Sequence, residues 1–215
     1  MKNLFDRFYK RYDAWYDRHK NAFRSELKAV RRFLPRKGKG LEVGVGTGRF
    51  AASLGIQIGI DPSKKMIAIA RTRGIDARWG RGESLPFPRS SFDHVVLIIT
   101  LCFVQKPACV LKEARRVLKK NGTLLVGMIP GDSALGAAYQ KKGSVFYKNA
   151  RFFTVTELLR KLTALKFSDF KICETLFRSP DKMTRPQNPK DGSGKGGFVV
   201  VACRKNESGR RAGRE

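Results

Sequence analysis

The chain has 215 residues, a length that fits one domain with or without a small appendage. Hydrophobic residues make up 41% of it and include fifteen Phe, which is enough for a core. No apolar run approaches the roughly 20 residues that a membrane helix needs, and the charged, aromatic start MKNLFDRFYKRYDAWYDRHK is not typical of a signal peptide.

The formal net charge is +27, from 45 Lys and Arg against 18 Asp and Glu. The excess is spread along the whole chain, without an RGG tract or a long lysine block. A field of this size raises the affinity for nucleic acids and other polyanions. We favour a general basic bias without a specific partner and keep a nucleic-acid partner as an alternative.

Four cysteines and two histidines are spaced in a way that matches no metal site. The cysteines are Cys102, Cys109, Cys173 and Cys203. Because they form no CxxC pair in a chain of this size, they are typical of reduced thiols in a cytoplasmic protein. We therefore predict a cytoplasmic location and no metal.

The N-terminal part, residues 3–34, has apolar and aromatic residues at helical spacing and predicts two helices that end at PRKGKG, residues 35–40. Short apolar runs then alternate with helical segments. The expected strands are residues 41–45, 56–60, 75–79, 92–99 and 123–129. The expected helices are residues 48–54, 62–73 and 107–119, the last ending at the stop signal KKNG.

The final third predicts a helix over residues 154–165 and strands over 169–175 and 198–203, joined by the Pro/Gly/Ser-rich residues 180–197. Alternating strands and helices imply an α/β fold with a parallel sheet and right-handed crossovers. The last two strands have no helix between them, which indicates an antiparallel pair at the sheet edge. Residues 206–215 are expected to be a disordered basic tail.

The stretch LEVGVGTGRFA places Gly44, Gly46 and Gly48 between a predicted strand and a helix. Backbone without Cβ can approach a ligand closely, and the start of a helix favours anionic groups. The nicotinamide fingerprint GxGxxG is not met, because the third glycine comes one position early and Arg49 stands where the last glycine belongs.

Asp61 ends the next predicted strand, in IGIDPSKKM, 17 residues after Gly44. A carboxylate there faces the same crevice as the glycines and can accept both hydroxyls of a ribose. The alternative is that Asp61 caps the helix that starts at Pro62, and both roles can coexist.

Four stretches together resemble class I S-adenosylmethionine-dependent methyltransferases, and among these the type 11 group. They are LEVGVGTGRFA, IGIDPSKKMIAIAR, GESLPFPRSSFDHVVLI and VLKEARRVLKKNGTLLVG. The resemblance is strong over residues 39–128 and extends to Cys203 in topology. It implies a Rossmann-like, seven-stranded, mostly parallel sheet with an antiparallel last strand, in three αβα layers under an N-terminal helical cap. The expected methyltransferase domain is 1–205, with the cap at 1–38 and the core at 39–205.

The resemblance also implies the contacts to S-adenosylmethionine: Glu42 near the amine, the glycines under the methionine part, Asp61 on the ribose, and Ile99 to Cys102 opposite the sulfonium. Arg81 stands where the family often has an Asp that contacts the adenine, so backbone groups near Gly82 and Glu83 are expected to replace it. The implied cofactor residues are Glu42, Gly44, Val45, Gly46, Thr47, Gly48, Asp61, Pro62, Ser63, Met66, Gly82, Glu83, Thr100 and Leu101.

No side chain is unmistakably catalytic, and the weak candidates are Tyr16, His19 and Tyr147. Tyr16 belongs to an aromatic N-terminal face that serves as a lid or as packing, and His19 ends the first helix. Tyr147, with Asn149 and Arg151, belongs to SVFYKNARFFT, where this fold inserts substrate-binding elements. Two other reactive residues have simpler readings, because Cys102 lies in an apolar run and His94 starts a strand away from the cofactor edge.

The resemblance implies methyl transfer from S-adenosylmethionine, with S-adenosylhomocysteine as product. We expect a small-molecule N, O or S acceptor, no membrane partner, and a monomer or homodimer. Two alternatives stay open, an RNA or ribosomal-protein methyltransferase and a regulatory protein that binds the cofactor without turnover.

Overall fold

The computed structural model describes residues 4–206, so residues 207–215 of the predicted disordered tail lie outside the described part. Within that part the chain forms a sheet of eight strands in the order β3-β2-β1-β4-β5-β8-β6-β7. The strands are β1 (Gly40–Val43), β2 (Ile58–Asp61), β3 (Asp76–Trp79), β4 (Phe92–Ile98), β5 (Leu118–Met128), β6 (Phe167–Thr175), β7 (Lys190–Asp191) and β8 (Phe198–Lys205).

The sheet is mostly parallel, and its order reverses between β1 and β4. The pairs β1–β2, β2–β3, β1–β4 and β4–β5 are parallel, whereas β8 runs antiparallel to both β5 and β6. The predicted antiparallel last strand is therefore confirmed. Crevices for ligands form at the carboxyl ends of the strands beside such a reversal, which puts the segment after β1 in the binding position.

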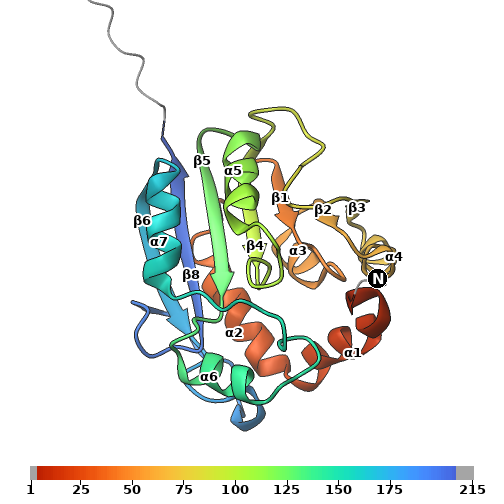
Figure 1. Cartoon of the computed structure of the whole chain (residues 1–215), viewed down its shortest axis with the longest axis vertical. Coiled ribbons are helices and arrows are strands. Elements are labelled where there is room, and N and C mark those ends of the chain that lie inside the picture. Colours follow the sequence, from red (N-terminus) through yellow and green to blue (C-terminus); the bar gives the residue numbers. More distant parts are fainter. Residues whose placement is uncertain (1–3, 207–215) are drawn as a thin grey trace, which may run out of the picture.

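Helices cover both faces, as the three-layer prediction requires. One face packs against α5 (Pro107–Val117) and α7 (Val155–Ala164), and the other against α2 (Lys20–Arg31), α3 (Arg49–Leu54) and α4 (Lys64–Thr72) (Figure 1). Side chains alternate along the central strands, so that Val95 and Leu97 of β4 face α5 whereas Val96 and Ile98 join the opposite core. Both halves of the core are continuous across the sheet.

The N-terminal helices lie at the carboxyl end of the parallel strands. Figure 1 shows α1 (Leu4–Arg18), α2 and α6 (Ala134–Lys141) together at the end to which the β5 arrow points. Helix α1 is kinked at Phe8. Its buried residue Tyr16 packs edge-on against Phe23 of α2 and Phe50 of α3. The expected helical cap is thus present and covers the crevice end of the sheet.

Three sequence predictions about elements are wrong. Helix α5 ends at Val117, not at residue 119, because Leu118 already pairs with Phe92 and is fully buried in the sheet. The KKNG segment therefore belongs to β5, where Asn121 adopts a left-handed φ of +56°. The sheet has eight strands and not seven, because the two-residue strand β7 forms inside the predicted connection. Helix α6 was not predicted either.

Candidate functional site

A glycine loop, residues 44–48, follows β1 at the reversal of strand order. Gly44 and Gly46 have φ values of +76° and +53°, which glycine adopts without steric cost. A Cβ on Gly44 would lie 2.5 Å from the side chain of Thr100, so the loop packs closely on the end of β4. A Cβ on Gly46 would meet no atom within 4 Å. The backbone at Gly46 therefore borders open space and leaves room for a ligand.

Asp61 lies at the end of β2 and fastens this loop to the next helix. One carboxylate oxygen accepts the backbone N–H of Gly46 at 2.9 Å, and the other accepts that of Ser63 at 2.8 Å. Burial raises the pKa of Asp61 to about 6, although both hydrogen bonds favour the charged form. The N-cap of α4 is Ser63, whose hydroxyl accepts a hydrogen bond from the N–H of Met66. Capping of α4 therefore does not account for the presence of an Asp at position 61. Each oxygen can accept a second hydrogen bond, which suits the two hydroxyls of a ribose.

Glu42 on β1 is a buried acid with an orphaned oxygen. It is 2% exposed, and its Oε2 has no hydrogen-bond partner among the described residues. Burial raises its pKa well above the usual range, and a backbone hydrogen bond from Ala51 only partly opposes this. A buried polar atom without a partner is costly, so a ligand that supplies a donor would stabilise this group. The amine of an amino-acid moiety is such a donor.

The segment after β3 closes one side of the crevice. Gly82 packs so closely on β1 that a Cβ would lie 2.9 Å from Val43. Arg81 is directed away, with a side chain 60% exposed and its Nε 3.9 Å from the Glu83 carboxylate. Trp79 is 61% exposed, and its indole N–H donates to the Pro62 carbonyl at 3.1 Å. This exposed indole next to Asp61 was not singled out from the sequence.

At the end of β4 the backbone is strained, and the Thr100 hydroxyl is hydrogen-bonded within the fold. Ile99 has a φ of +51°, which is an outlier for a β-branched residue and a feature that gathers at functional sites. The Thr100 hydroxyl donates within the fold, with the Val43 and Ile98 carbonyls both at 3.1 Å. Leu101 is buried. Thr100 therefore positions the loop and offers little to a ligand.

Helix α1 is fastened onto the glycine loop by acidic residues that the sequence analysis did not identify. Asp13 accepts hydrogen bonds from the Thr47 hydroxyl at 2.5 Å, from Arg49 at 2.7 Å and from Arg73 at 2.9 Å. Burial opposes the ionisation of Asp13, but these hydrogen bonds outweigh it and hold its pKa below the usual range. Arg49, where the nicotinamide fingerprint has a glycine, thus has an ion-pairing role.

A second acid fastens the start of α1. The Ser63 hydroxyl donates to Asp6 at 2.6 Å, and the backbone N–H of Lys65 donates to the same oxygen at 3.1 Å. Both ends of α1 are therefore bound to the segments that follow β1 and β2. These bonds hold α1 against the segments that border the crevice.

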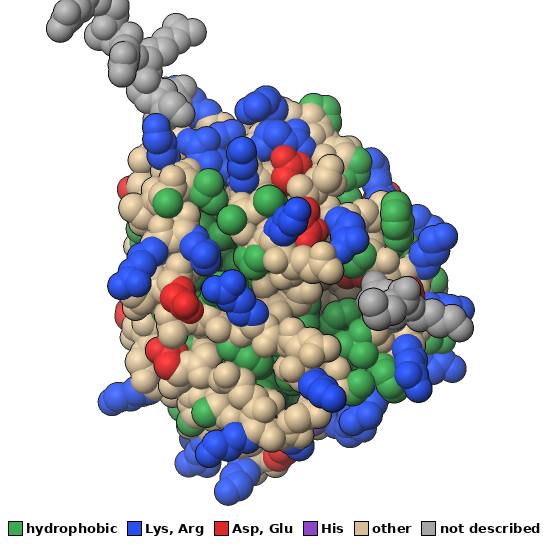
Figure 2. Space-filling view, viewed as in Figure 1, with side chains coloured by type: hydrophobic (Ala, Val, Ile, Leu, Met, Phe, Trp, Pro, Cys, Tyr) green, Lys and Arg blue, Asp and Glu red, His purple; other side chains and the backbone are tan. Residues whose placement is uncertain are grey.

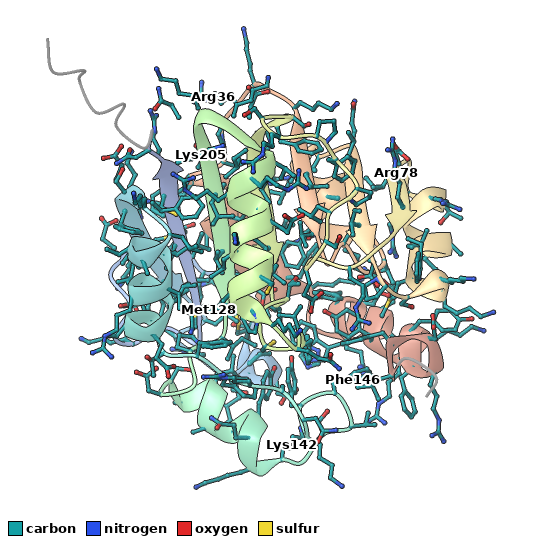
Figure 3. All side chains as sticks on the ribbon, turned by 45° about the horizontal axis from the view of Figure 1, so that its top comes forward. Arg36, Arg78, Met128, Lys142, Phe146 and Lys205 are labelled. Atoms are coloured by element: carbon teal, nitrogen blue, oxygen red, sulfur yellow. The ribbon has the colours of Figure 1, made fainter. Side chains whose placement is uncertain are left out.

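A cavity of about 850 Å³ lies between α1, α2, α6 and the ends of β4 and β5. Its wall is strongly aromatic, with Tyr12, Trp15, Tyr16, Tyr139, Phe146 and Tyr147. Figure 3 shows Phe146 beside α1, and its ring lies 5.5 Å from that of Tyr12. Tyr139 and Tyr147 stack at 4.7 Å. The size is that of a small-molecule site, and the wall is the apolar kind that such sites have.

All three catalytic candidates line this cavity, but none is placed as a free base. Burial raises the pKa of Tyr16 and of Tyr147 well above 10, so both phenols stay protonated at neutral pH. His19 uses both ring nitrogens, one with the Trp15 carbonyl and one with Asp181, each at 2.8 Å. Tyr16 and Tyr147 can therefore donate hydrogen bonds and shape the cavity. His19, which directly follows α1, connects this helix to Asp181.

Tyr12 lines the cavity and lies within electrostatic range of the crevice. Its hydroxyl lies 3.1 Å from that of Tyr16. Burial raises its pKa and the bond to Tyr16 opposes this, while the charges of Cys102, Glu26 and Asp61 raise it further. One phenol is therefore within electrostatic range of Asp61 at the crevice and of Glu26 in the cavity. Tyr12 was noted in the sequence only as a member of the aromatic face.

The other residues considered from the sequence lie outside this chemistry. Burial raises the pKa of the Cys102 thiol to about 12, so the thiol stays protonated at neutral pH. His94 packs against Gly40 near the start of β4, away from the cavity, as predicted. Asn149 and Arg151 are not among the residues that line the cavity, and their acceptor contacts stay a prediction. Within residues 4–206 no cluster of three His, Cys, Asp or Glu could hold a metal.

Comparison with known proteins identifies the family. A family profile described as "Methyltransferase domain" matches residues 41–126. A SAM-dependent methyltransferase of Thermotoga maritima, described as a possible histamine N-methyltransferase, superposes with a TM-score of 0.93. It is 45% identical, and the match covers 96% of this chain and 100% of that one.

Two further relatives differ in how much of the chain they match. An uncharacterized protein of Methanocaldococcus jannaschii is 42% identical over 205 residues, 94% of this chain and 99% of that protein. A demethylmenaquinone methyltransferase of Tropheryma whipplei is 41% identical over 95 residues, 40% of this chain and 39% of that one. The match to the Thermotoga maritima enzyme covers its entire length, and it has the fold that the four sequence stretches predict. The chain therefore belongs to the S-adenosylmethionine-dependent methyltransferases, and its methyl donor is S-adenosylmethionine.

Proposed function

We propose that the chain transfers a methyl group from S-adenosylmethionine to a nitrogen, oxygen or sulfur atom of a small molecule bound in the aromatic cavity. The observation that carries this proposal is the position of the cavity. Tyr12 lines the cavity and is close enough to Asp61 for that charge to raise its pKa, and the strained Ile99 at the end of β4 lines the cavity too. An acceptor held there would lie next to the crevice in which the methyl donor is expected.

The residues around the glycine loop fit this cofactor. The Glu42 oxygen that has no partner would accept a hydrogen bond from the ammonium of the methionine part, and Asp61 would accept hydrogen bonds from the ribose hydroxyls. Gly46 leaves space for the chain of the ligand, and Trp79 and Pro62 would border the adenine. When bound, the cofactor supplies a methyl group on a sulfonium, which an acceptor lone pair can take directly.

The contribution of the protein to the reaction is positioning and exclusion of water. Asp6 and Asp13 would hold α1 over the cofactor, and the protonated tyrosines would orient the acceptor.

We further propose that residues 1–205 act as one methyltransferase domain in which residues 1–38 form the cap. The monomeric or homodimeric state and the cytoplasmic location stay predictions. The structure adds only that no helix within residues 4–206 is long and apolar enough to cross a membrane.

An RNA or protein acceptor is the second candidate, because of the net charge of +27. Figure 2 shows Lys and Arg side chains scattered over the whole visible face, not gathered around one groove. A cavity walled by aromatic rings and covered by α1 also suits a small molecule better than a polymer. Since the chain is a methyltransferase, we do not propose the alternative of binding without turnover.

The test combines binding and turnover. Calorimetry should detect S-adenosylhomocysteine binding that Asp61→Ala weakens at least about tenfold, through loss of charge-assisted hydrogen bonds. A panel of small amines, thiols, phenols, carboxylates and RNA is then scored by release of S-adenosylhomocysteine. Release with a small molecule supports the proposal. Release with RNA alone, or retention on RNA that weakens steeply with salt, supports the second candidate.

A further inference from the structure

Glu26 is a buried carboxyl that the family resemblance did not point to. It lies in α2, lines the cavity and is 1% exposed. Its Oε2 has no hydrogen-bond partner among the described residues, and no ion pair to Glu26 is formed in that part of the chain. Its neighbour Ser25 is fully used, since it donates to the Asn21 carbonyl and accepts the N–H of Gln187. The fold thus satisfies Ser25 and leaves Glu26 without a partner.

Four tyrosines from three segments line the same cavity as this carboxyl. Burial raises the pKa of each of them, and the charge of Glu26 raises it further in every case. They are Tyr12 and Tyr16 of α1, Tyr139 of α6 and Tyr147 of the loop after α6. Aromatic faces attract cations, and an unpaired acid among them is costly until a cation arrives. The combination is therefore suited to a positive group and unsuited to a negative one.

The Lys and Arg side chains that line the cavity do not fill this role. Arg11, Arg18 and Lys142 also line the cavity, but all three are exposed and solvated at its mouth. Figure 3 shows Lys142 at the outer end of α6. The other acid in the lining, Asp181, is exposed and already paired with His19 at 2.8 Å. Within the described lining, Glu26 is thus the buried acid that remains available to a ligand.

We propose that Glu26 and the tyrosines around it form the recognition site for a small cationic amine, with Glu26 as the residue that determines specificity. This inference rests on the proposed function, because it names the acceptor class for the same cavity. The ammonium group of the acceptor would lie at Glu26, with ring faces of the tyrosines around it, and the rest of the acceptor would extend along the aromatic wall. The Thermotoga maritima relative, described as a possible histamine N-methyltransferase, is named for an acceptor of this class.

The test uses histamine and tyramine as cationic probes, p-cresol as the neutral analogue of tyramine, and benzoate as an anion. Calorimetry at pH 8.5, above the raised pKa of about 8 of Glu26, measures the affinity of each for the protein saturated with S-adenosylhomocysteine. We expect at least one amine to bind, p-cresol and benzoate to bind at least about tenfold more weakly, and Glu26→Gln to lower the amine affinity at least about tenfold. Glu26→Asp, which keeps the charge, should retain part of the affinity.

The control is Asp132→Asn, an exposed acid before α6 that does not line the cavity, and it should bind the amine as the wild type does. Equal amine affinity in wild type and Glu26→Gln would overturn the inference, and so would preferred binding of benzoate or p-cresol. S-adenosylhomocysteine release separates the two proposals. Methylation of p-cresol alone would support the proposed function and contradict the role of Glu26. Amine binding that depends on Glu26, without methylation of any small molecule, would support the role of Glu26 and contradict the proposed function.

Discussion

The burial of Glu26 predicts a specific dependence of stability on pH. Removing its charge with Glu26→Gln changes little of its shape. Burial raises the pKa of the native carboxyl from 4.5 to about 8, whereas the unfolded chain keeps the ordinary value. Between these values the folded state binds more protons than the unfolded state, so the free energy of unfolding falls as the pH rises.

The magnitude follows from the two pKa values. One pKa unit corresponds to about 1.4 kcal/mol of unfolding free energy. Raising the pKa from 4.5 to about 8 therefore stabilises the fold at low pH, and up to about 4 kcal/mol of this stabilisation is lost between pH 5 and pH 8.5. Urea unfolding of wild type and Glu26→Gln at both pH values measures this loss, because the other titrating groups cancel in the difference. We expect the variant to gain on the wild type as the pH rises. An unchanged difference between the two proteins would refute the burial argument.

Three more predictions concern the cofactor side of the site. S-adenosylhomocysteine affinity should fall as the pH drops through about 6, because Asp61 then becomes protonated and accepts hydrogen bonds less well; calorimetry at pH 5 and 7.5 measures this, and equal affinities would contradict it. Asp13→Asn should loosen α1 and speed amide hydrogen exchange over residues 4–18, with little change in the core. Unchanged exchange would show that Asp13 does not hold α1 in place. Gly46→Val should reduce cofactor affinity through the side chain it adds above the loop and through its left-handed φ, while urea unfolding separates that effect from a loss of stability; unaltered affinity would show that the ligand lies elsewhere.

The sequence was a good guide wherever a local pattern determines the structure. The glycines after β1 and the acid at the end of β2 are read from residue type and spacing, and the alternation of strands and helices fixes the parallel part of the sheet. The end of α5 was missed because burial of Leu118 against Phe92 overrides the helix-stop signal at KKNG. The strand β7 is too short for any pattern to indicate it.

The acceptor side could not be predicted, because it is assembled from distant segments. Glu26 looks like one of many charged residues in a basic helix, and only the packing of α1 and α6 encloses it. Asp13 meets Arg49 and Arg73 across separations of 36 and 60 residues, which no local spacing indicates. A hint existed in α2, where apolar residues stand three or four positions from Glu26 on either side: Ala22, Phe23, Ala29 and Val30. Helical periodicity could have placed this acid on the buried face of α2.

Binding of the acceptor in the aromatic cavity can be tested by filling the cavity and leaving the crevice intact. Ala138 lines the cavity from α6, and Ala138→Trp would occupy part of the space for the acceptor. S-adenosylhomocysteine release with the best small-molecule acceptor of the panel is measured alongside cofactor affinity. We predict that release falls at least about tenfold while cofactor affinity stays within about twofold of wild type. Undiminished release by the variant would show that the acceptor binds outside this cavity.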